Sequence, residues 1–128
     1  MHFDQRTQQA LREAGLENDA IVEISDRVAE LVERDADRLE AFFDAHASVY
    51  SDMELAHSRS EFPEHAVEYC DLFTHGADLR GYLRFDSWGV PVEGGRVLRG
   101  DDRPELVELS LGPTVDARVK FAPERDAL

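Results

Sequence analysis

Lysine is almost missing from this chain, and acidic residues outnumber basic ones. The sequence has 28 Asp and Glu residues against 14 Lys and Arg residues, for a net charge of −14, and Lys120 is its one lysine. An ordinary domain mixes both signs on its surface and uses lysine freely. At about 1 M ionic strength the Debye length falls to roughly 3 Å, so a charge of this size hardly repels itself. The composition therefore predicts a protein from a salt-accumulating halophile.

Other absences exclude several classes of protein. Cys70 is the single cysteine, which excludes an internal disulfide framework. No apolar run approaches the length of a membrane span and the N-terminus has no apolar signal core, so we expect a soluble, cytoplasmic protein with no membrane partner. The sequence has no phosphate-binding Gly-rich loop, Rossmann fingerprint, Gly-x-Ser-x-Gly elbow or His-Glu-x-x-His motif, so we expect no cofactor and favour a protein that is not an enzyme. The acidic balance also argues against nucleic-acid binding.

The 128 residues fit one domain, and its first part has a helical pattern. Within residues 4–75 we expect a short helix over 4–14, a long helix over 18–46 and a third helix over 63–74. The long helix would measure roughly 42 Å, which exceeds the width of a compact domain of this size. It therefore either breaks at residues 35–37, where its apolar stripe is interrupted, or projects toward a partner. A projecting end would favour a homodimer.

The second part of the chain changes to a two-residue alternation. Leu79, Leu83 and Phe85 share one side of a predicted strand. Residues 77–122 contain enough such segments for four or five antiparallel strands, with a hairpin turn expected at Gly94-Gly95. We therefore predict an α+β fold, in which the N-terminal helices pack on one face of this sheet.

The polar side of the predicted sheet is the first candidate site. If the alternation holds, basic and aromatic side chains point outward from two strands, and these residues are Arg80, Tyr82, Arg84, Arg118 and Lys120. Arginine forks bind carboxylates and phosphates bidentately, and a tyrosine between them can stack on a ring. This pattern predicts a surface that binds an anionic ligand or an unknown protein partner. The alternative is that Glu108, Asp116 and Asp86 neutralise these cations in cross-strand pairs.

A segment rich in carboxylates and imidazoles provides the second candidate. His57, Glu61, His65 and Glu68 could serve a small hydrolase-like enzyme, since acid–base chemistry uses such groups in a cleft. In a chain this acidic, however, any window of similar length contains many carboxylates. A zinc site formed by His57, His65, Cys70 and His75 is a weaker hypothesis. The last three are spaced five apart and would point in three directions from a helix. We therefore expect no metal.

Three segments carry a resemblance to a known family. Residues 50–57, 61–69 and 71–89 are similar to those of a small family of uncharacterised haloarchaeal proteins, and the resemblance covers essentially the full length. It implies a haloarchaeal source and a domain of unknown function, and it supplies no activity, cofactor or catalytic residue. Our working hypothesis from the sequence is a non-enzymatic binding or interaction module.

Overall fold

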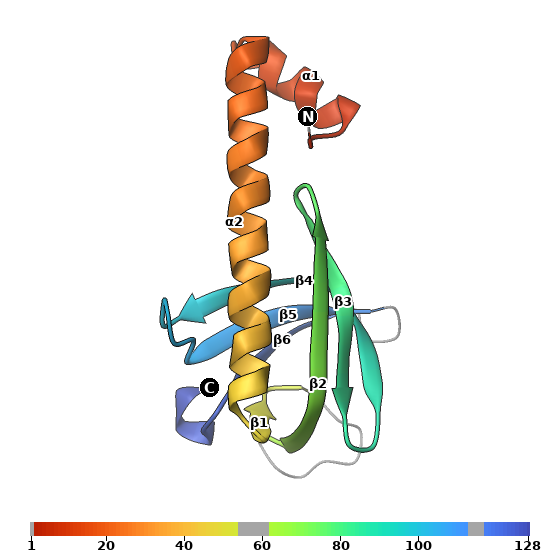
Figure 1. Cartoon of the computed structure of the whole chain (residues 1–128), viewed down its shortest axis with the longest axis vertical. Coiled ribbons are helices and arrows are strands. Elements are labelled where there is room, and N and C mark those ends of the chain that lie inside the picture. Colours follow the sequence, from red (N-terminus) through yellow and green to blue (C-terminus); the bar gives the residue numbers. More distant parts are fainter. Residues whose placement is uncertain (1, 54–61, 113–116) are drawn as a thin grey trace.

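The computed structural model places two helices before six antiparallel strands (Figure 1), and it describes residues 2–53, 62–112 and 117–128. The fold is α+β, as the sequence predicts, although the sheet has six strands where we expected four or five. The elements in chain order are α1 (Gln5–Glu13), α2 (Asn18–Ala45), β1 (Ser48–Ser51), β2 (Glu64–His75), β3 (Asp78–Phe85), β4 (Gly89–Arg99), β5 (Leu106–Leu111), β6 (Ala117–Ala122) and the 3-10 helix η1 (Arg125–Ala127).

Local hydrogen bonds define both ends of the short helix α1. The Asp4 carboxylate caps its N-terminus by accepting a hydrogen bond of 2.7 Å from the backbone N–H of Thr7. At its C-terminus Gly15 has φ 98°, and the N–H of Leu16 donates to the carbonyl of Leu11, the pattern of a Schellman motif. This turn reverses the chain, so that α1 folds back beside the start of α2 (Figure 1).

The helix α2 is unbroken over its 28 residues, and its N-terminal half projects beyond the body of the barrel, with the tip of the β2–β3 hairpin beside the middle of the helix (Figure 1). The C-terminal half packs on the barrel through side chains such as Phe42 and Phe43, which are each 1% exposed. In the projecting half, Ile24 and Leu31 stay 38% and 41% exposed. Within the described residues, no helix combines the length and the apolar character that crossing a bilayer requires.

The N-terminus connects the projecting helix to the tip of the β2–β3 hairpin. The backbone N–H of His2 donates to the hydroxyl of Ser25 on α2 over 2.6 Å, and Ser25 is fully buried. Gly76 forms the hairpin turn with φ 59°, and a Cβ added to it would lie 2.9 Å from the Cβ of His2. One side of the projecting half is therefore supported by the N-terminus, which itself contacts the tip of the β2–β3 hairpin.

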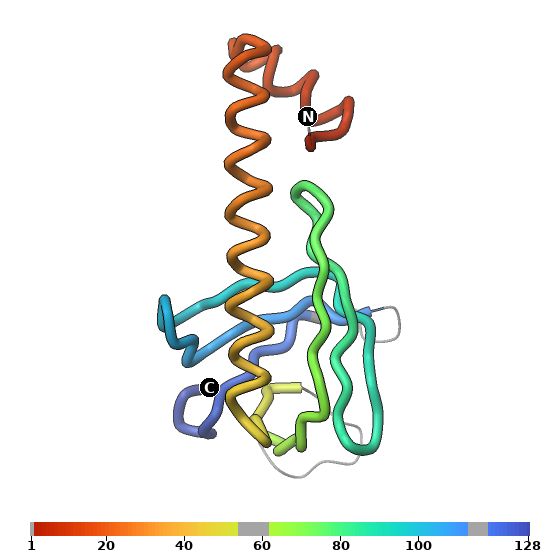
Figure 2. Tube along the Cα trace, in the orientation of Figure 1, coloured from red at the N-terminus to blue at the C-terminus, as the bar shows by residue number. Residues whose placement is uncertain are grey.

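The six strands close into an antiparallel barrel in the order β1-β2-β3-β4-β5-β6, with β1 pairing with β6. Figure 2 shows the path of the chain, in which the C-terminal half of α2 crosses in front of β4 and β5. The core lies between α2 and the inner side of the barrel, where Phe43 and Phe121 meet with their ring centroids 5.3 Å apart. The predicted alternation in β3 is confirmed, since Leu79, Leu83 and Phe85 are all buried.

The predicted third helix is wrong, because residues 64–75 form the strand β2. The N-terminal helical part of the chain therefore ends at Ala45 and not at residue 75. β2 pairs with β3 along most of its length, and a bulge between Val67 and Tyr69 interrupts its regular alternation. The segment consequently lacks the simple two-residue period that identifies a strand from sequence, and its long-range pairing decides its structure.

The predicted turn at Gly94-Gly95 is also wrong, because both glycines lie inside β4. The turn before β4 instead has the N–H of Phe85 donating to the carbonyl of Trp88 over 2.7 Å. A Cβ added to Gly95 would lie 2.7 Å from Leu109 Cδ2 and 2.9 Å from Leu39 Cδ1. Glycine is needed here because α2 approaches the barrel closely at this point.

Candidate functional site

The five residues that the sequence proposes as a binding site lie on the outer side of the barrel, in two separate groups. β3 carries Arg80, Tyr82 and Arg84, and β6 carries Arg118 and Lys120. These strands are not neighbours, because β4 and β5 lie between them in one direction and β2 and β1 in the other. The structure thus brings together the members of each group, but it does not bring the two groups together.

The first group belongs to a cross-strand ladder on the outer side of the β2–β3 hairpin. Its six members, which we call the hairpin face, pair as Tyr69 with Arg84, Asp71 with Tyr82 and Phe73 with Arg80. The contribution of β2 is missing from the sequence prediction, because a helix was expected there. The alternation of β3 alone located only half of this surface.

Three aromatic side chains of the hairpin face are open to solvent. Tyr69, Phe73 and Tyr82 are 41%, 64% and 37% exposed, and the tyrosine ring centroids lie 6.4 Å apart. A Cβ added to Gly89 would lie 2.5 Å from the Tyr82 ring, so this ring lies directly over the backbone of β4. Among the described residues, the other exposed large apolar side chains are on α2. The hairpin face is therefore the one described surface where exposed aromatic rings gather.

The two arginines of the hairpin face differ in how firmly they are held. Arg80 Nη1 donates hydrogen bonds to the carbonyls of Glu93 over 2.6 Å and Leu79 over 3.0 Å, which fixes the guanidinium beside β4. Arg84 Nε lies 3.5 Å from the carboxylate of Glu68, and both of these side chains are more than a third exposed. An exposed pair of this kind contributes little to stability. Arg84 is therefore available to a partner's carboxylate at small cost.

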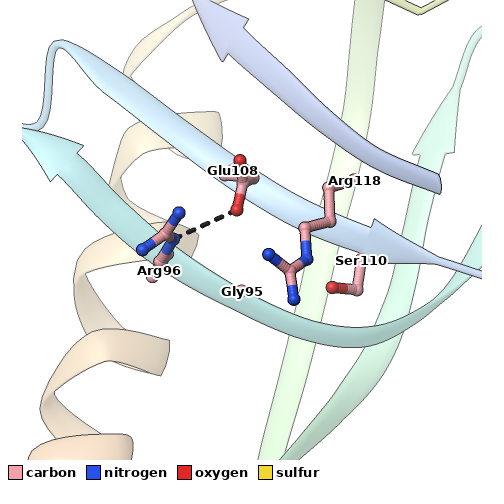
Figure 3. Close-up of a pocket in the computed structure, with 5 residues that line it drawn as sticks. All are labelled: Gly95, Arg96, Glu108, Ser110 and Arg118. Carbon is pink, nitrogen blue, oxygen red and sulfur yellow. Dashed lines mark hydrogen bonds and ion pairs between the residues drawn. The ribbon is translucent and has the colours of Figure 1, made fainter.

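The second group borders a hollow on the outer side of β4, β5 and β6 (Figure 3). The hollow has a volume of about 220 Å³ and is lined by Gly95, Arg96, Glu108, Ser110 and Arg118. Arg96 and Lys120 flank Glu108 in one cross-strand row, and Arg118 lies opposite Ser110 in the next. Glu108 accepts a hydrogen bond of 3.0 Å from Arg96 Nε, so it neutralises Arg96, which is not one of the five predicted binding residues. Asp116 lies outside the described residues.

His65 belongs to the barrel interior. Its Nε2 lies 2.8 Å from the hydroxyl of Ser51, and its ring stacks on Phe85 with 4.7 Å between centroids. His65 is 6% exposed and Ser51 is fully buried. Burial disfavours the imidazolium and lowers the pKa of His65. The pair therefore acts as a neutral, hydrogen-bonded part of the core.

The alternative catalytic set is not gathered around one pocket in the described part of the chain. His65 points into the barrel, whereas Glu68 is exposed on its outer side next to Arg84. His57 and Glu61 lie outside the described residues. The two members that can be placed thus lie on opposite sides of the sheet and share no cleft.

The residues considered for zinc are also dispersed. His65 and Cys70 are buried, while His75 is exposed at the end of β2. Burial raises the pKa of the Cys70 thiol to about 12, and a thiol that stays protonated is a poor metal ligand. Within the described ranges, no three His, Cys, Asp or Glu side chains form a group that could hold a metal ion.

Comparison with known proteins places the chain in a family without assigning a function. Residues 1–126 match a family of unknown function (DUF7532), and the chain belongs to that family. No curated protein and no solved structure matches the chain. Its function therefore has to be inferred from the two outer surfaces described above.

Proposed function

We propose that this member of the DUF7532 family is a non-catalytic binding module that docks a protein partner on its hairpin face. The observation that supports this is the exposure of Tyr69, Phe73 and Tyr82 side by side, since no other Phe, Tyr or Trp ring among the described residues is as exposed. Tyrosine, phenylalanine and arginine are enriched at protein interfaces, and a few such residues supply most of the binding energy. The hairpin face combines all three residue types on two paired strands.

The arrangement of the hairpin face defines the chemistry of the partner. Tyr82 lies between Arg80 and Arg84 along β3, so an apolar group of the partner would contact the ring while carboxylates reach the two guanidiniums. Residues 81–84 of β3 pair with β2 on one edge and with β4 on the other, so the partner cannot add a strand along this part of β3. We therefore infer docking through side chains, with an apolar centre flanked by acidic groups on the partner.

Affinity capture from a host lysate in molar KCl tests this docking surface. The variant Phe73→Ala with Tyr82→Ala removes two exposed rings. As a control, Val22→Ala with Leu31→Ala removes two α2 side chains that are 40% and 41% exposed. Each lost anchor of an interface typically weakens binding by about 2 kcal/mol or more, so the hairpin variant should lose its partner. The α2 variant should retain the same partner.

The opposite pattern would contradict the proposal. If the α2 variant lost the captured protein and the hairpin variant kept it, docking would occur on the projecting helix, where a homodimer contact was expected. Arg84→Glu and Arg118→Glu are best compared separately, because Arg84 lies on β3 and Arg118 on β6, which are not neighbouring strands. Arg84→Glu should weaken capture, and Arg118→Glu should leave it unchanged.

We further propose that the protein works in the molar-salt cytoplasm of a halophilic archaeon. The supporting observation is the dominance of arginine over lysine together with acidic residues crowded on α2, which has nine acids and three arginines between Asn18 and Ala45. Transfer from molar KCl to dilute buffer should remove most of the helical circular-dichroism signal, because the screening of carboxylate repulsion is lost. Equal stability without salt would refute this assignment.

A further inference from the structure

We propose that the hollow on β4, β5 and β6 is a binding site for a phosphate group, either free or on a small phosphorylated molecule. The site is separate from the hairpin face, and the inference does not depend on the proposed protein partner. It depends on the local charge of the hollow, the orientation of its donors and the shape of its floor (Figure 3).

The charge around the hollow is opposite to that of the whole chain. Among the residues that line the hollow, Arg96 on β4 and Arg118 on β6 flank one carboxylate, that of Glu108 on β5. Lys120 lies beside Glu108 on β6, and its backbone N–H donates to the carboxylate of Asp52. The complete chain instead has two acidic residues for each basic one. A local excess of cations in such a chain favours an anionic ligand.

The donors of the hollow converge from two strands across β5. Glu108, whose side chain is 11% exposed, accepts from Arg96 Nε and so holds that guanidinium in place, with the Nη groups left for a ligand. Arg118 extends over β5 beside the Ser110 hydroxyl (Figure 3). Two guanidiniums and a hydroxyl provide enough N–H and O–H donors for the oxygens of one tetrahedral anion.

The glycine at position 94 keeps one side of the hollow open. A Cβ added to Gly94 would lie 3.6 Å from Ser110 Oγ, so a side chain at this position would cover the hydroxyl. A Cβ on Gly95 next to it would point inward, toward Leu109 and Leu39, so only the backbone of Gly95 borders the hollow. The remaining volume of about 220 Å³ suits a small ligand better than a drug-sized one.

Competition with salt narrows the ligand class further. This competition rests on the molar-salt cytoplasm proposed above. At about 1 M ionic strength the net charge of −14 is screened within a few ångströms, so it does not repel an anion that is in contact with the arginines. Chloride at molar concentration would displace a ligand held by a single charge. A phosphate dianion is retained better, because each arginine fork can donate two parallel hydrogen bonds to it.

A titration observed by NMR tests the site directly. The ¹⁵N-labelled protein in molar KCl is titrated with potassium phosphate at constant potassium concentration, and the amide shifts of Gly94, Gly95 and Ser110 are followed. We expect saturable shifts, an affinity about tenfold or more weaker in Arg118→Gln, and an intermediate loss in Arg118→Lys, which keeps the charge without the fork. Arg27→Gln on α2 is the matched control and should titrate like the unaltered protein.

A parallel titration with glycerol phosphate distinguishes the two sources of the phosphate group. Tighter binding of the ester than of inorganic phosphate would identify a phosphorylated small molecule, and the reverse order would identify the free ion. Shifts that rise linearly without saturation would overturn the proposal. An Arg118→Gln variant that binds phosphate as tightly as the unaltered protein would also overturn it.

Discussion

The packing of α2 on the barrel makes a quantitative prediction about two leucines on the same helix. Leu39 is fully buried against the barrel, whereas Leu31 is 41% exposed on the projecting half. Leu39→Ala leaves a cavity and should lower the free energy of unfolding by about 2.7–5 kcal/mol. For a chain of this length the melting temperature should fall by roughly 10–25 °C. Leu31→Ala should change the free energy of unfolding by less than about 1 kcal/mol, since alanine favours helix and little apolar area is lost.

Urea denaturation in molar KCl, followed by circular dichroism, measures both variants under the same screening. Urea is preferred because it is uncharged and leaves the ionic strength constant. The midpoint should shift for Leu39→Ala with an unchanged denaturant slope, which would indicate a loss of stability without a change in the unfolded state. If the two substitutions had equal effects, the C-terminal half of α2 would not be the part that completes the barrel core.

Two further predictions concern the barrel interior. Burial lowers the pKa of His65 in the folded state below its usual 6.5, so the unfolded chain binds the proton more tightly than the folded chain does. The contribution of His65 to stability should therefore be complete above pH 6.5 and should fall as the pH decreases below that value. The urea midpoint is measured between neutral pH and pH 5 for the unaltered protein and for His65→Phe. A steeper decline in the unaltered protein would support this role of His65, and parallel declines in the two proteins would contradict it. Gly95→Ala should lower the free energy of unfolding by about 1–3 kcal/mol, because its Cβ would press on Leu109 and Leu39. Gly94→Ala is the matched control, because its Cβ would lie at an ordinary contact distance of 3.6 Å from Ser110 Oγ. Equal destabilisation of the two variants would contradict the close approach of α2 to the barrel at Gly95.

The sequence pattern predicted those elements whose period is regular. The three- and four-residue spacing of apolar side chains predicted the long helix, and the alternation of Val107, Leu109 and Leu111 predicted β5, where all three are buried. The two-residue alternation along β3 likewise predicted that Tyr82 points outward, and Tyr82 is 37% exposed. In these segments the spacing of the apolar residues agrees with their burial in the fold, so the sequence alone is enough to predict the helix or strand.

The remaining features depend on contacts between distant segments. The bulge after Val67 hides the period of β2, and its pairing with β3 cannot be read from the strand itself. The closure of the barrel rests on a short contact in which Tyr50 pairs with Ala122 and Ser51 with Phe121, far apart in the chain. The strand order decides which of the five predicted binding residues lie together. Because β3 and β6 are not neighbours, the single predicted surface is two surfaces in the structure.

The central claim is that a partner docks on the hairpin face, and crosslinking in living cells tests it most directly. Phe73, which is 64% exposed, is replaced by a photo-crosslinking phenylalanine derivative, and Leu31 is replaced in a matched strain. We predict that light produces a discrete covalent adduct with a partner protein at position 73 and none at position 31. An adduct at position 31 with none at position 73 would contradict the assignment of the docking surface.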